Sequence, residues 1–230
     1  MTESQAVPNV APAGISGWRA AEGAVEPKLP RGNHGIPHEE VKRSQKGRML
    51  RACLEHLGRD GKVNVSQIVK GAGVSRKAFY ESYIDLDACI LDALITANVV
   101  LGTEMLAAIE LADPSDPTYK IRTLVREFCQ MSSEEPQVTV AIAGTAYALN
   151  QATRQVWTEV LNARRGIVLA YWAEAQMRDP ELRPTTPDRA MAAGRFLEGR
   201  ILEEISAGRE AQLPVTAESI ADSFIEIVGG

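Results

Sequence analysis

Hydrophobic residues recur every three or four positions along most of this chain, which is the spacing of a buried stripe on a helix. Residues 38–57 form one such segment, and Gly58 is expected just beyond its last turn; its inner residues are Met49, Cys53 and Leu57. A longer helix is predicted over residues 86–111, because Asp85 can cap its first turn and its apolar residues cover more than one face. No segment alternates between apolar and polar residues as a strand does. These patterns predict an all-α fold.

Prolines mark expected helix starts in the second half of the chain. Proline is favoured at the first helical position, and it follows a polar residue in the pairs Asp116–Pro117, Glu135–Pro136 and Thr186–Pro187. The last two helices are expected near residues 187–207 and 217–228. Their apolar stripes are expected to be exposed, which favours a four-helix contact with a second copy and hence a homodimer. In total the pattern predicts about nine helices.

Residues 64–83 have the pattern of two short helices joined by a glycine turn. Asn64 and Gln67 can form a capping box at the start of the first helix. Gly73 suits the left-handed conformation that ends a helix, and Ser75 can cap the helix that follows. This arrangement is typical of a helix-turn-helix.

The second of these helices has two different sides. Phe79 and Tyr83 fall on one side of a helical wheel, and the opposite side carries Lys77, Tyr80 and Glu81. A helix this short is stable only when it packs against neighbours. Its outward side is therefore available for a partner.

The charge of the chain is unevenly distributed. Its 230 residues are 45% hydrophobic and 24% charged, with a net charge of −5, which indicates a globular protein. Residues 31–77 hold eleven Lys or Arg against four Asp or Glu, a local charge of +7, whereas the remainder carries −12. A basic segment on an acidic body fits a head that binds DNA. A solvated helix face in a soluble protein gives the same pattern.

Several other classes of protein are not indicated. Cys53, Cys89 and Cys129 lie in helical apolar patterns without CxxC spacing, so we expect buried thiols in a reducing cytoplasm, with no disulfide framework and no metal site. No run of eighteen apolar residues and no signal-peptide pattern occurs, so export and a membrane span are not expected. Residues 1–36 are rich in Ala, Gly and Pro without periodicity, which predicts a disordered N-terminal arm.

Residues 31–94 resemble the N-terminal domain of the TetR/AcrR family of bacterial transcriptional regulators. The matching positions are Ile68, Val69, Ala72-Gly73-Val74-Ser75, Phe79-Tyr80 and Asp85. The resemblance implies a DNA-binding domain over residues 37–85 and a helical effector-binding and dimerisation domain over residues 86–230. Two positions depart from the family pattern: Leu86 stands where lysine is usual, and Tyr83 where phenylalanine is usual.

The resemblance also implies which residues contact double-stranded DNA. Phosphate contacts are expected from Asn64, Ser66, Tyr80, and Lys46 or Lys70. Base edges in the major groove are expected to meet Arg76, Lys77, Ala78 and Glu81.

A small-molecule effector is expected in a cavity of the body. Its candidate lining is Met105, Phe128, Met131, Tyr147, Trp157, Tyr171, Trp172 and Phe196. This mostly apolar set suits a hydrophobic effector, although helical aromatic residues also serve as plain core. Glu198 shares a stripe with apolar residues, and we expect it to pair with an arginine such as Arg154 or Arg195, or to meet a polar group of the ligand.

The function predicted from the sequence is therefore that of a DNA-binding transcriptional regulator without a cofactor. Its expected mode is repression, with ligand releasing the protein from a palindromic operator. One alternative is a dimeric small-molecule-binding protein whose DNA binding is weak or lost. Another is an all-helical enzyme, but the three histidines (His34, His38 and His56) lie in the arm or head, and no HExxH motif or Gly-rich phosphate loop occurs.

Overall fold

The computed structural model describes residues 38–145 and 151–230. Within these ranges all regular structure is helical and no strand occurs, which confirms the all-α prediction. The elements are α1 (His38–Asp60), α2 (Val65–Ala72), α3 (Arg76–Ser82), α4 (Leu86–Leu111), α5 (Tyr119–Glu134), α6 (Pro136–Thr145), α7 (Gln151–Arg178), α8 (Pro187–Ser206), the 3-10 turn η2 (Glu210–Gln212) and α9 (Leu213–Gly229). The arm predicted over residues 1–36 lies outside the described residues.

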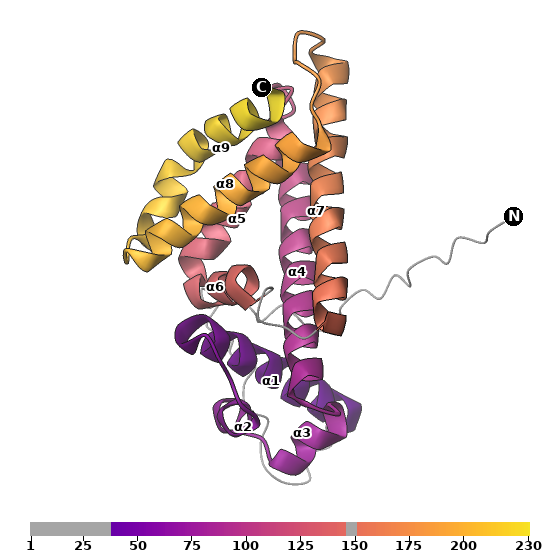
Figure 1. The fold of residues 1–230 in the computed structure, drawn as a ribbon, viewed down its shortest axis with the longest axis vertical. Helices are drawn as coiled ribbons and strands as arrows, with labels where there is room; N and C mark the ends of the chain where they lie inside the picture. The colour runs from indigo at the N-terminus through magenta and orange to yellow at the C-terminus, as the bar shows by residue number, and fades with distance from the viewer. Residues whose placement is uncertain (1–37, 146–150) are drawn as a thin grey trace, which may run out of the picture.

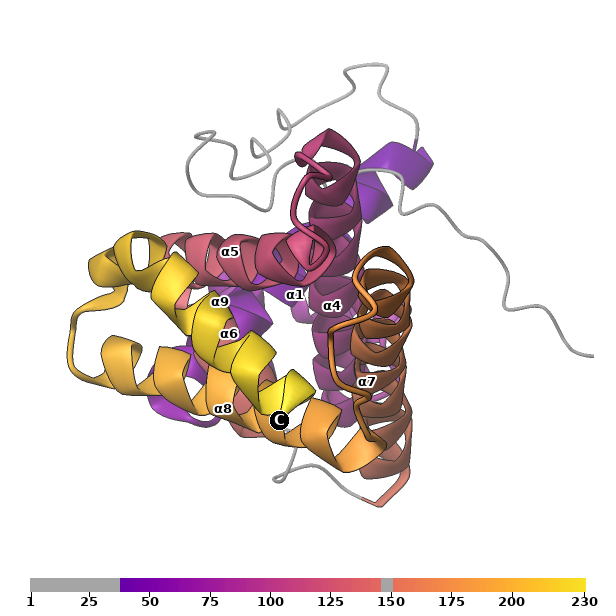
Figure 2. The same ribbon diagram turned by 90° about the horizontal axis from the view of Figure 1, so that it is seen from above.

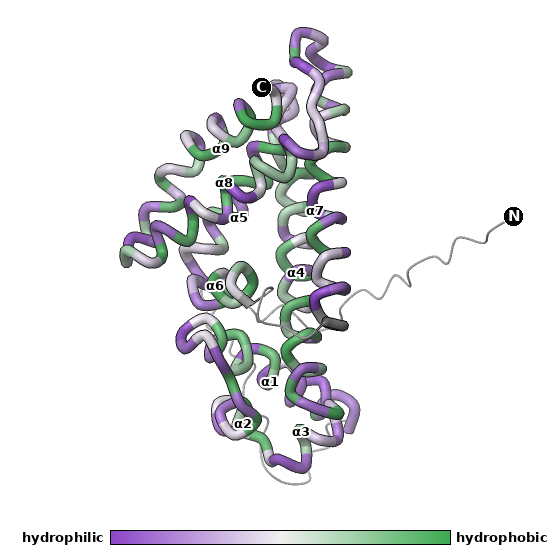
Figure 3. The backbone as a smooth tube through the Cα atoms, viewed as in Figure 1, coloured by the Kyte–Doolittle hydropathy of each residue, from purple (hydrophilic) through white to green (hydrophobic). Residues whose placement is uncertain are grey.

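The helices form a small head and a larger body. Figure 1 shows α1, α2 and α3 at one end of the molecule, with α4 running from this head into the body. Figures 1 and 2 both place α7 beside α4, with α8 and α9 together on the other side of the body. The hydropathy colouring in Figure 3 is green over most of α4, whereas α7 alternates between green and purple. The helix α4 is therefore the apolar element shared by head and body.

Two clusters of buried apolar side chains make up the interior. The head core joins α1, α2, α3 and the first turns of α4 to residues of α6 and to Trp157 of α7. The body core joins the later turns of α4 to α5, α8, α9 and the C-terminal half of α7. Ala97 belongs to the first cluster and Leu101 to the second, so the change occurs within one turn of α4.

The three cysteines are buried thiols, as expected from the sequence. Cys53 and Cys89 lie in the head core and Cys129 lies in the body core. Contact with Cys89 and burial together raise the pKa of the Cys53 thiol. Burial also raises the pKa of Cys129, to about 12. Both thiols therefore stay protonated and unreactive at neutral pH.

The predicted end of α1 was wrong, because Gly58 lies inside the helix. The helix continues to Asp60, and Gly61 follows it with a φ of 66°. Gly58 instead faces the start of α6. A Cβ atom at this position would lie 1.8 Å from the carbonyl oxygen of Gln137. Glycine is needed here for the close approach of two helices and not for ending one.

An ion pair strengthens the same helix contact. The Arg51 Nη2 atom lies 3.0 and 3.1 Å from the two carboxylate oxygens of Glu135, the residue just before α6. Both side chains are largely buried, and Arg51 also donates to Glu55 at 2.8 Å. Charged hydrogen bonds of this kind are directional as well as attractive. The pair therefore fixes the position of α6 on α1.

Two of the three helix starts predicted at proline were correct and one was wrong. Pro136 begins α6 and Pro187 begins α8, where Thr186 caps the first turn. Asp116 and Pro117, however, belong to a turn, and α5 begins at Tyr119. Asp116 accepts hydrogen bonds from the backbone and the hydroxyl of Thr118, at 2.7 and 2.8 Å. These bonds stabilise a turn in competition with an earlier helix start.

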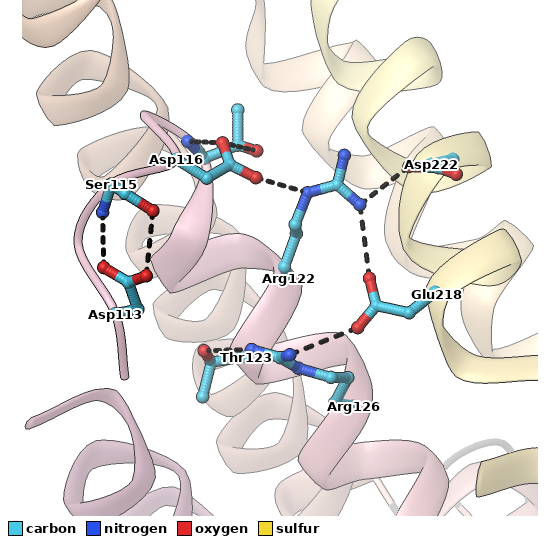
Figure 4. A network of polar contacts seen from close by, with 9 residues as sticks. Asp113, Ser115, Asp116, Arg122, Thr123, Arg126, Glu218 and Asp222 are labelled. Carbon is cyan, nitrogen blue, oxygen red and sulfur yellow. Dashed lines mark hydrogen bonds and ion pairs between the residues drawn. The ribbon is translucent and has the colours of Figure 1, made fainter. Parts of the chain in front are cut away.

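Arg122 connects this turn to the last helix, as Figure 4 shows. Its Nε donates to Asp116 Oδ2 at 2.6 Å, and its Nη1 donates to Asp222 Oδ1 of α9 at 2.7 Å. Glu218 of α9 lies between Arg122 and Arg126, with nitrogen–oxygen distances of 3.4 and 3.2 Å. Burial acts to raise the pKa of Asp116, but the hydrogen bonds from Thr118 and Arg122 hold that pKa below its ordinary value.

The apolar stripes of α8 and α9 are less exposed than expected. Both helices pack on each other and on α5. Leu197, Ile201, Ile220, Phe224 and Val228 are buried in the body core, and their stripe residues Leu202, Ile205 and Ile227 are half-buried. The prediction that these stripes are exposed was therefore wrong for most of their residues, because other helices of the same chain cover them. The predicted contact with a second copy remains a prediction that must use the outer faces of these helices.

Replacing Gly58 by alanine should destabilise the protein. The added methyl group would overlap the Gln137 carbonyl, so α1 and α6 must separate, and we expect a loss of about 2 kcal/mol or more in the free energy of unfolding. Urea denaturation followed by circular dichroism measures this loss. Gly166→Ala in α7 is the matched control: a Cβ there meets nothing within 4 Å, so a gain of up to about 1 kcal/mol is expected. Equal effects of the two changes would contradict the close approach.

Replacing Arg122 by glutamine should cost about 1–2 kcal/mol at neutral pH, because two short charged hydrogen bonds are lost. A carboxyl with a depressed pKa contributes stability above its unfolded pKa and loses it as pH falls through its folded pKa. The difference between wild type and variant should therefore shrink below about pH 4. Arg126→Gln, which removes a more exposed single contact, should cost less than about 1 kcal/mol. A deficit for Arg122→Gln that grew on acidification would contradict this account.

Candidate nucleic-acid interface

The start of α2 forms the predicted capping box. Asn64 Oδ1 accepts from the Gln67 backbone amide at 3.0 Å, and Gln67 Oε1 accepts from the Asn64 amide at 2.9 Å. Because the side-chain oxygen of Asn64 accepts a hydrogen bond within the capping box, the side-chain Nδ2 group is the donor of Asn64 that remains for an anion. Asn64, Ser66 and Lys70 are all exposed. The proposed phosphate contacts of α2 are thus accessible.

The turn between α2 and α3 is fixed from both sides. Gly73 has φ 64° and ψ 37°, the left-handed conformation expected from the sequence. Ser75 Oγ accepts from the Ala78 amide at 3.1 Å and so caps α3. From α1, Arg48 Nε donates to the Ala72 carbonyl at 2.9 Å. The angle between the two short helices is therefore set by backbone conformation and by an anchor on α1.

The helix α3 buries one side and exposes the other, as predicted. Phe79 is fully buried and Tyr83 is 6% exposed, both within the head core. The outer side carries Arg76, Lys77, Tyr80 and Glu81, all exposed, with Ala78 half-buried. Lys77 Nζ lies 3.7 Å from Glu81 Oε1 along this side. Four polar side chains, which include both hydrogen-bond donors and acceptors, thus face solvent on one short helix.

Tyr83 takes part in a polar contact that the sequence alone did not reveal. Its hydroxyl donates to Asp92 Oδ2 of α4 at 2.7 Å, and burial together with this carboxylate raises the pKa of Tyr83. Lys46 Nζ lies 2.9 Å from the same oxygen and 5.8 Å from the centre of the Tyr83 ring. Asp92 therefore offsets part of the Lys46 charge. Lys46 is about half exposed and stays within reach of a partner.

Leu86 and Ile84 also lie next to this surface. Leu86, in place of the lysine usual in the family, packs against the head core as a half-buried residue. Ile84 was not singled out from the sequence, yet its side chain is 88% exposed between α3 and α4. The border of the interface is thus more apolar at this point than the family pattern implies.

The residues expected around an effector divide between the two cores. Phe128, Met131 and Trp172 are buried in the body core, and Met105, Tyr171 and Phe196 are partly buried against it. Trp157 is buried in the head core instead. Tyr147 lies outside the described residues. The structure thus brings six of the eight together, and their role in binding remains a prediction.

Glu198 pairs with an arginine, but not with Arg154. Its Oε1 lies 3.5 Å from Arg164 Nη1 of α7, and the positive charge of Arg195 also favours the ionised form of Glu198. Arg154 is exposed near the start of α7. The sequence indicated an arginine partner correctly. It could not identify Arg164, since the pairing depends on how α7 and α8 pack.

Several solved structures with the same fold are transcriptional regulators. The fatty acid degradation regulator FadR from Bacillus halodurans superposes with a TM-score of 0.69 at 13% identity, over 79% of this chain and 94% of that one. FadR from Bacillus subtilis, in complex with stearoyl-CoA, gives 0.69 at 12% identity, over 79% and 98%. The regulatory protein TetR from Rhodobacter sphaeroides gives 0.62 at 21% identity, over 78% and 96%. The chain has the fold of the TetR-type regulators.

Sequence comparisons add nothing to this likeness: no protein-family model matches the chain, and no curated protein matches it. The TetR-type fold nevertheless covers both head and body, since the superpositions extend over about four fifths of the chain. It agrees with the resemblance drawn from residues 31–94. Within this fold, α2 and α3 form the helix-turn-helix, and α4 connects it to the body.

Two further features of the described residues concern other functions. They contain no group of three or more His, Cys, Asp or Glu side chains placed to hold a metal ion. Among them α4 alone is long and apolar enough to cross a membrane by length and composition. It contributes buried residues to both cores, which accounts for that composition.

Replacing Gly73 by alanine should strain the turn of the helix-turn-helix. A non-glycine residue in the left-handed region costs about 1–2 kcal/mol, so we expect the free energy of unfolding to fall by that amount. Gly73→Asn should cost clearly less, because asparagine adopts this conformation more readily than other residues do. Chemical denaturation of both variants checks the order. Equal stability of the alanine and asparagine variants would contradict the observed backbone conformation.

Proposed function

We propose that this protein is a sequence-specific DNA-binding transcriptional regulator of the TetR type. The observation that carries the proposal is the outer side of α3, where Arg76, Lys77, Tyr80 and Glu81 face solvent while Phe79 and Tyr83 hold the helix in the head core. A helix presented in this way fits the major groove of B-DNA. The local charge of +7 over residues 31–77 favours the approach of phosphates.

Each residue of the interface has a distinct proposed role. Arg76 and Lys77 donate to guanine, Glu81 accepts from cytosine, and Ala78 contacts a thymine methyl group. Asn64, Ser66, Lys70 and Tyr80 bind phosphate and set the register of the head on the duplex. Lys46 adds a weaker phosphate contact, because Asp92 offsets part of its charge. Residues 37–85 are the proposed DNA-binding domain.

The proposed active form is a homodimer in the cytoplasm. Two heads would place their recognition helices in successive major grooves of a palindromic operator. The outer faces of α8 and α9 are the proposed contact between copies, because these helices stand together on one side of the body (Figures 1 and 2). Repression is the proposed mode, with no cofactor and no catalytic step.

A small hydrophobic effector is proposed to release the operator. The stearoyl-CoA complex of the Bacillus subtilis FadR, a protein of the same fold, supports a small-molecule effector. The close packing of α6 on α1, at Gly58 and at the Arg51–Glu135 pair, supports a route from body to head. If ligand and operator favour different positions of α1, each weakens the other by the same factor.

One alternative function has a specific observation in its favour. Leu86 packs against the head core in place of a phosphate-binding lysine, and Lys46 is engaged by Asp92. Both features lower the expected affinity for DNA. The alternative is a small-molecule-binding protein that retains the head without DNA binding, and it predicts no selection of any DNA sequence.

The test begins with selection of bound duplexes from a random DNA pool by the full chain. Gel shifts at one fixed salt concentration then measure the affinity of the wild type, Arg76→Ala and Lys77→Ala for the selected duplex. Each variant should lose about 1–3 kcal/mol of binding free energy, the cost of one bidentate base contact. Arg178→Ala, which removes the same charge from the far end of α7, is the matched control and should bind as the wild type does.

The outcome decides between the two functions. A selected palindrome whose binding depends on Arg76 and Lys77 supports the regulator. Failure to enrich any sequence, or equal affinity of wild type and both α3 variants, would contradict it. Failure to enrich any sequence would favour the alternative protein that binds only a small molecule.

A further inference from the structure

Three polar side chains meet inside the body, where the two apolar cores separate. Arg164 of α7 donates through Nη2 to Asn98 Oδ1 of α4, and its Nη1 lies 3.5 Å from Glu198 Oε1 of α8. The guanidinium also lies over the ring of Trp157, 6.0 Å from its centre. We call Asn98, Arg164 and Glu198 the polar cluster. It joins three helices that are distant in sequence.

The polar cluster is only partly satisfied by its own members. A nitrogen–oxygen distance of 3.5 Å is at the limit of a hydrogen bond, so Arg164 and Glu198 do not form a tight ion pair. Burial lowers the pKa of Arg164 and raises the pKa of Glu198, which shows that desolvation outweighs their mutual attraction. The cluster therefore contains charge that a further polar group could stabilise.

Solvent-accessible surface remains around these side chains. Arg164 is 30% exposed and Glu198 is 34% exposed, although protein atoms surround both closely enough to shift their pKa values. Leu161, three residues before Arg164 on α7, is 38% exposed. Both polar and apolar solvent-accessible surface therefore occur at the polar cluster.

Two glycines leave room beside the polar cluster. Gly102 lies one helical turn after Asn98 on α4, and Gly194 lies one turn before Glu198 on α8. A Cβ atom at either position would meet nothing within 4 Å. Glycine is less favourable than alanine inside a helix, so helix stability does not account for glycine at either position. The space next to the cluster is open on both helices.

The local charge favours an anion. Arg164 and Arg195 both act on Glu198, so two cations face a single carboxylate. Apolar residues continue from the cluster along the same helix faces: Met105 lies two turns beyond Asn98, and Val168 lies one turn beyond Arg164, both packed against the body core. A ligand with one acidic group and an apolar remainder matches this arrangement.

We propose that the polar cluster binds the carboxylate of an amphipathic effector. Arg164 holds the acid group, Asn98 orients the guanidinium, and the apolar remainder of the ligand lies toward Met105 and Val168. Glu198 competes with the ligand for Arg164 and so limits its affinity. The proposal rests on the effector-responsive function proposed above and specifies the ligand as a hydrophobic carboxylic acid. Trp157 connects the site to the head core, to which it belongs.

The first experiment compares head groups on one apolar chain. Isothermal titration calorimetry with the full chain, in the absence of DNA, measures binding of octanoate and decanoate, with 1-decanol and decylamine as matched ligands. Decanoate should bind at least about tenfold more tightly than decanol, because only the acid forms charged hydrogen bonds to Arg164. Equal affinity for acid and alcohol, or tighter binding of the amine, would overturn the proposal. So would failure of both acids to bind.

The second experiment uses two variants expected to act in opposite directions. Arg164→Gln should weaken decanoate at least about tenfold, since the charged contact is lost. Glu198→Gln should strengthen decanoate about fivefold or more, because a like charge next to the bound carboxylate is removed. A purely structural pair predicts that both changes weaken binding. Arg154→Gln removes the same charge from an exposed position on α7 and should leave affinity unchanged.

Circular dichroism and thermal unfolding show whether each variant is folded. If Arg164→Gln does not fold, Glu198→Gln and the acid–alcohol comparison still decide, because neither removes the arginine. Weaker acid binding in folded Glu198→Gln would overturn the proposal.

The two proposals can fail separately. Binding of selected DNA with no preference for acids would overturn the ligand assignment and leave the regulator intact. Preference for acids without selection of any DNA would overturn the regulator and leave the ligand assignment intact.

Discussion

The contact of α1 with α6 is the constraint on which the rest of the structure depends. These helices belong to head and body, and they approach closely enough that Gly58 has no room for a side chain. The Arg51–Glu135 pair adds a charged contact at the same place. Packed interiors transmit displacement instead of absorbing it. A movement of α6 must therefore move α1, and with it the anchor that Arg48 provides for the turn before α3.

A group of polar side chains adjoins the two apolar cores. Head core and body core meet within one turn of α4, and the polar cluster of Asn98, Arg164 and Glu198 lies at that level. Buried charged groups are expensive unless they are paired well, and this pair is long. A group that stabilises these charges would change the packing of α4, α7 and α8 together. The polar cluster is thus placed to couple a bound molecule to the helix that enters the head.

The head shows how much of a site can be predicted from local signals. The capping box at Asn64, the left-handed Gly73 and the Ser75 cap all occur as predicted. The sides of α3 also follow from periodicity, since Phe79 and Tyr83 are buried. The partner of Tyr83 could not be predicted in this way. Asp92 lies on a different helix, and its distance from Lys46 depends on the packing of α1 against α4.

By itself the sequence determined the all-helical fold, the caps at Asn64, Gly73 and Ser75, and the outward side of α3, because those features depend on residues within one or two turns of each other. Tertiary structure alone decided what Gly58 is for, which arginine meets Glu198, and that α8 and α9 bury most of their apolar stripes. Each of these outcomes joins residues tens of positions apart. Periodicity shows that a helix has an apolar side, but only packing shows which neighbour covers that side.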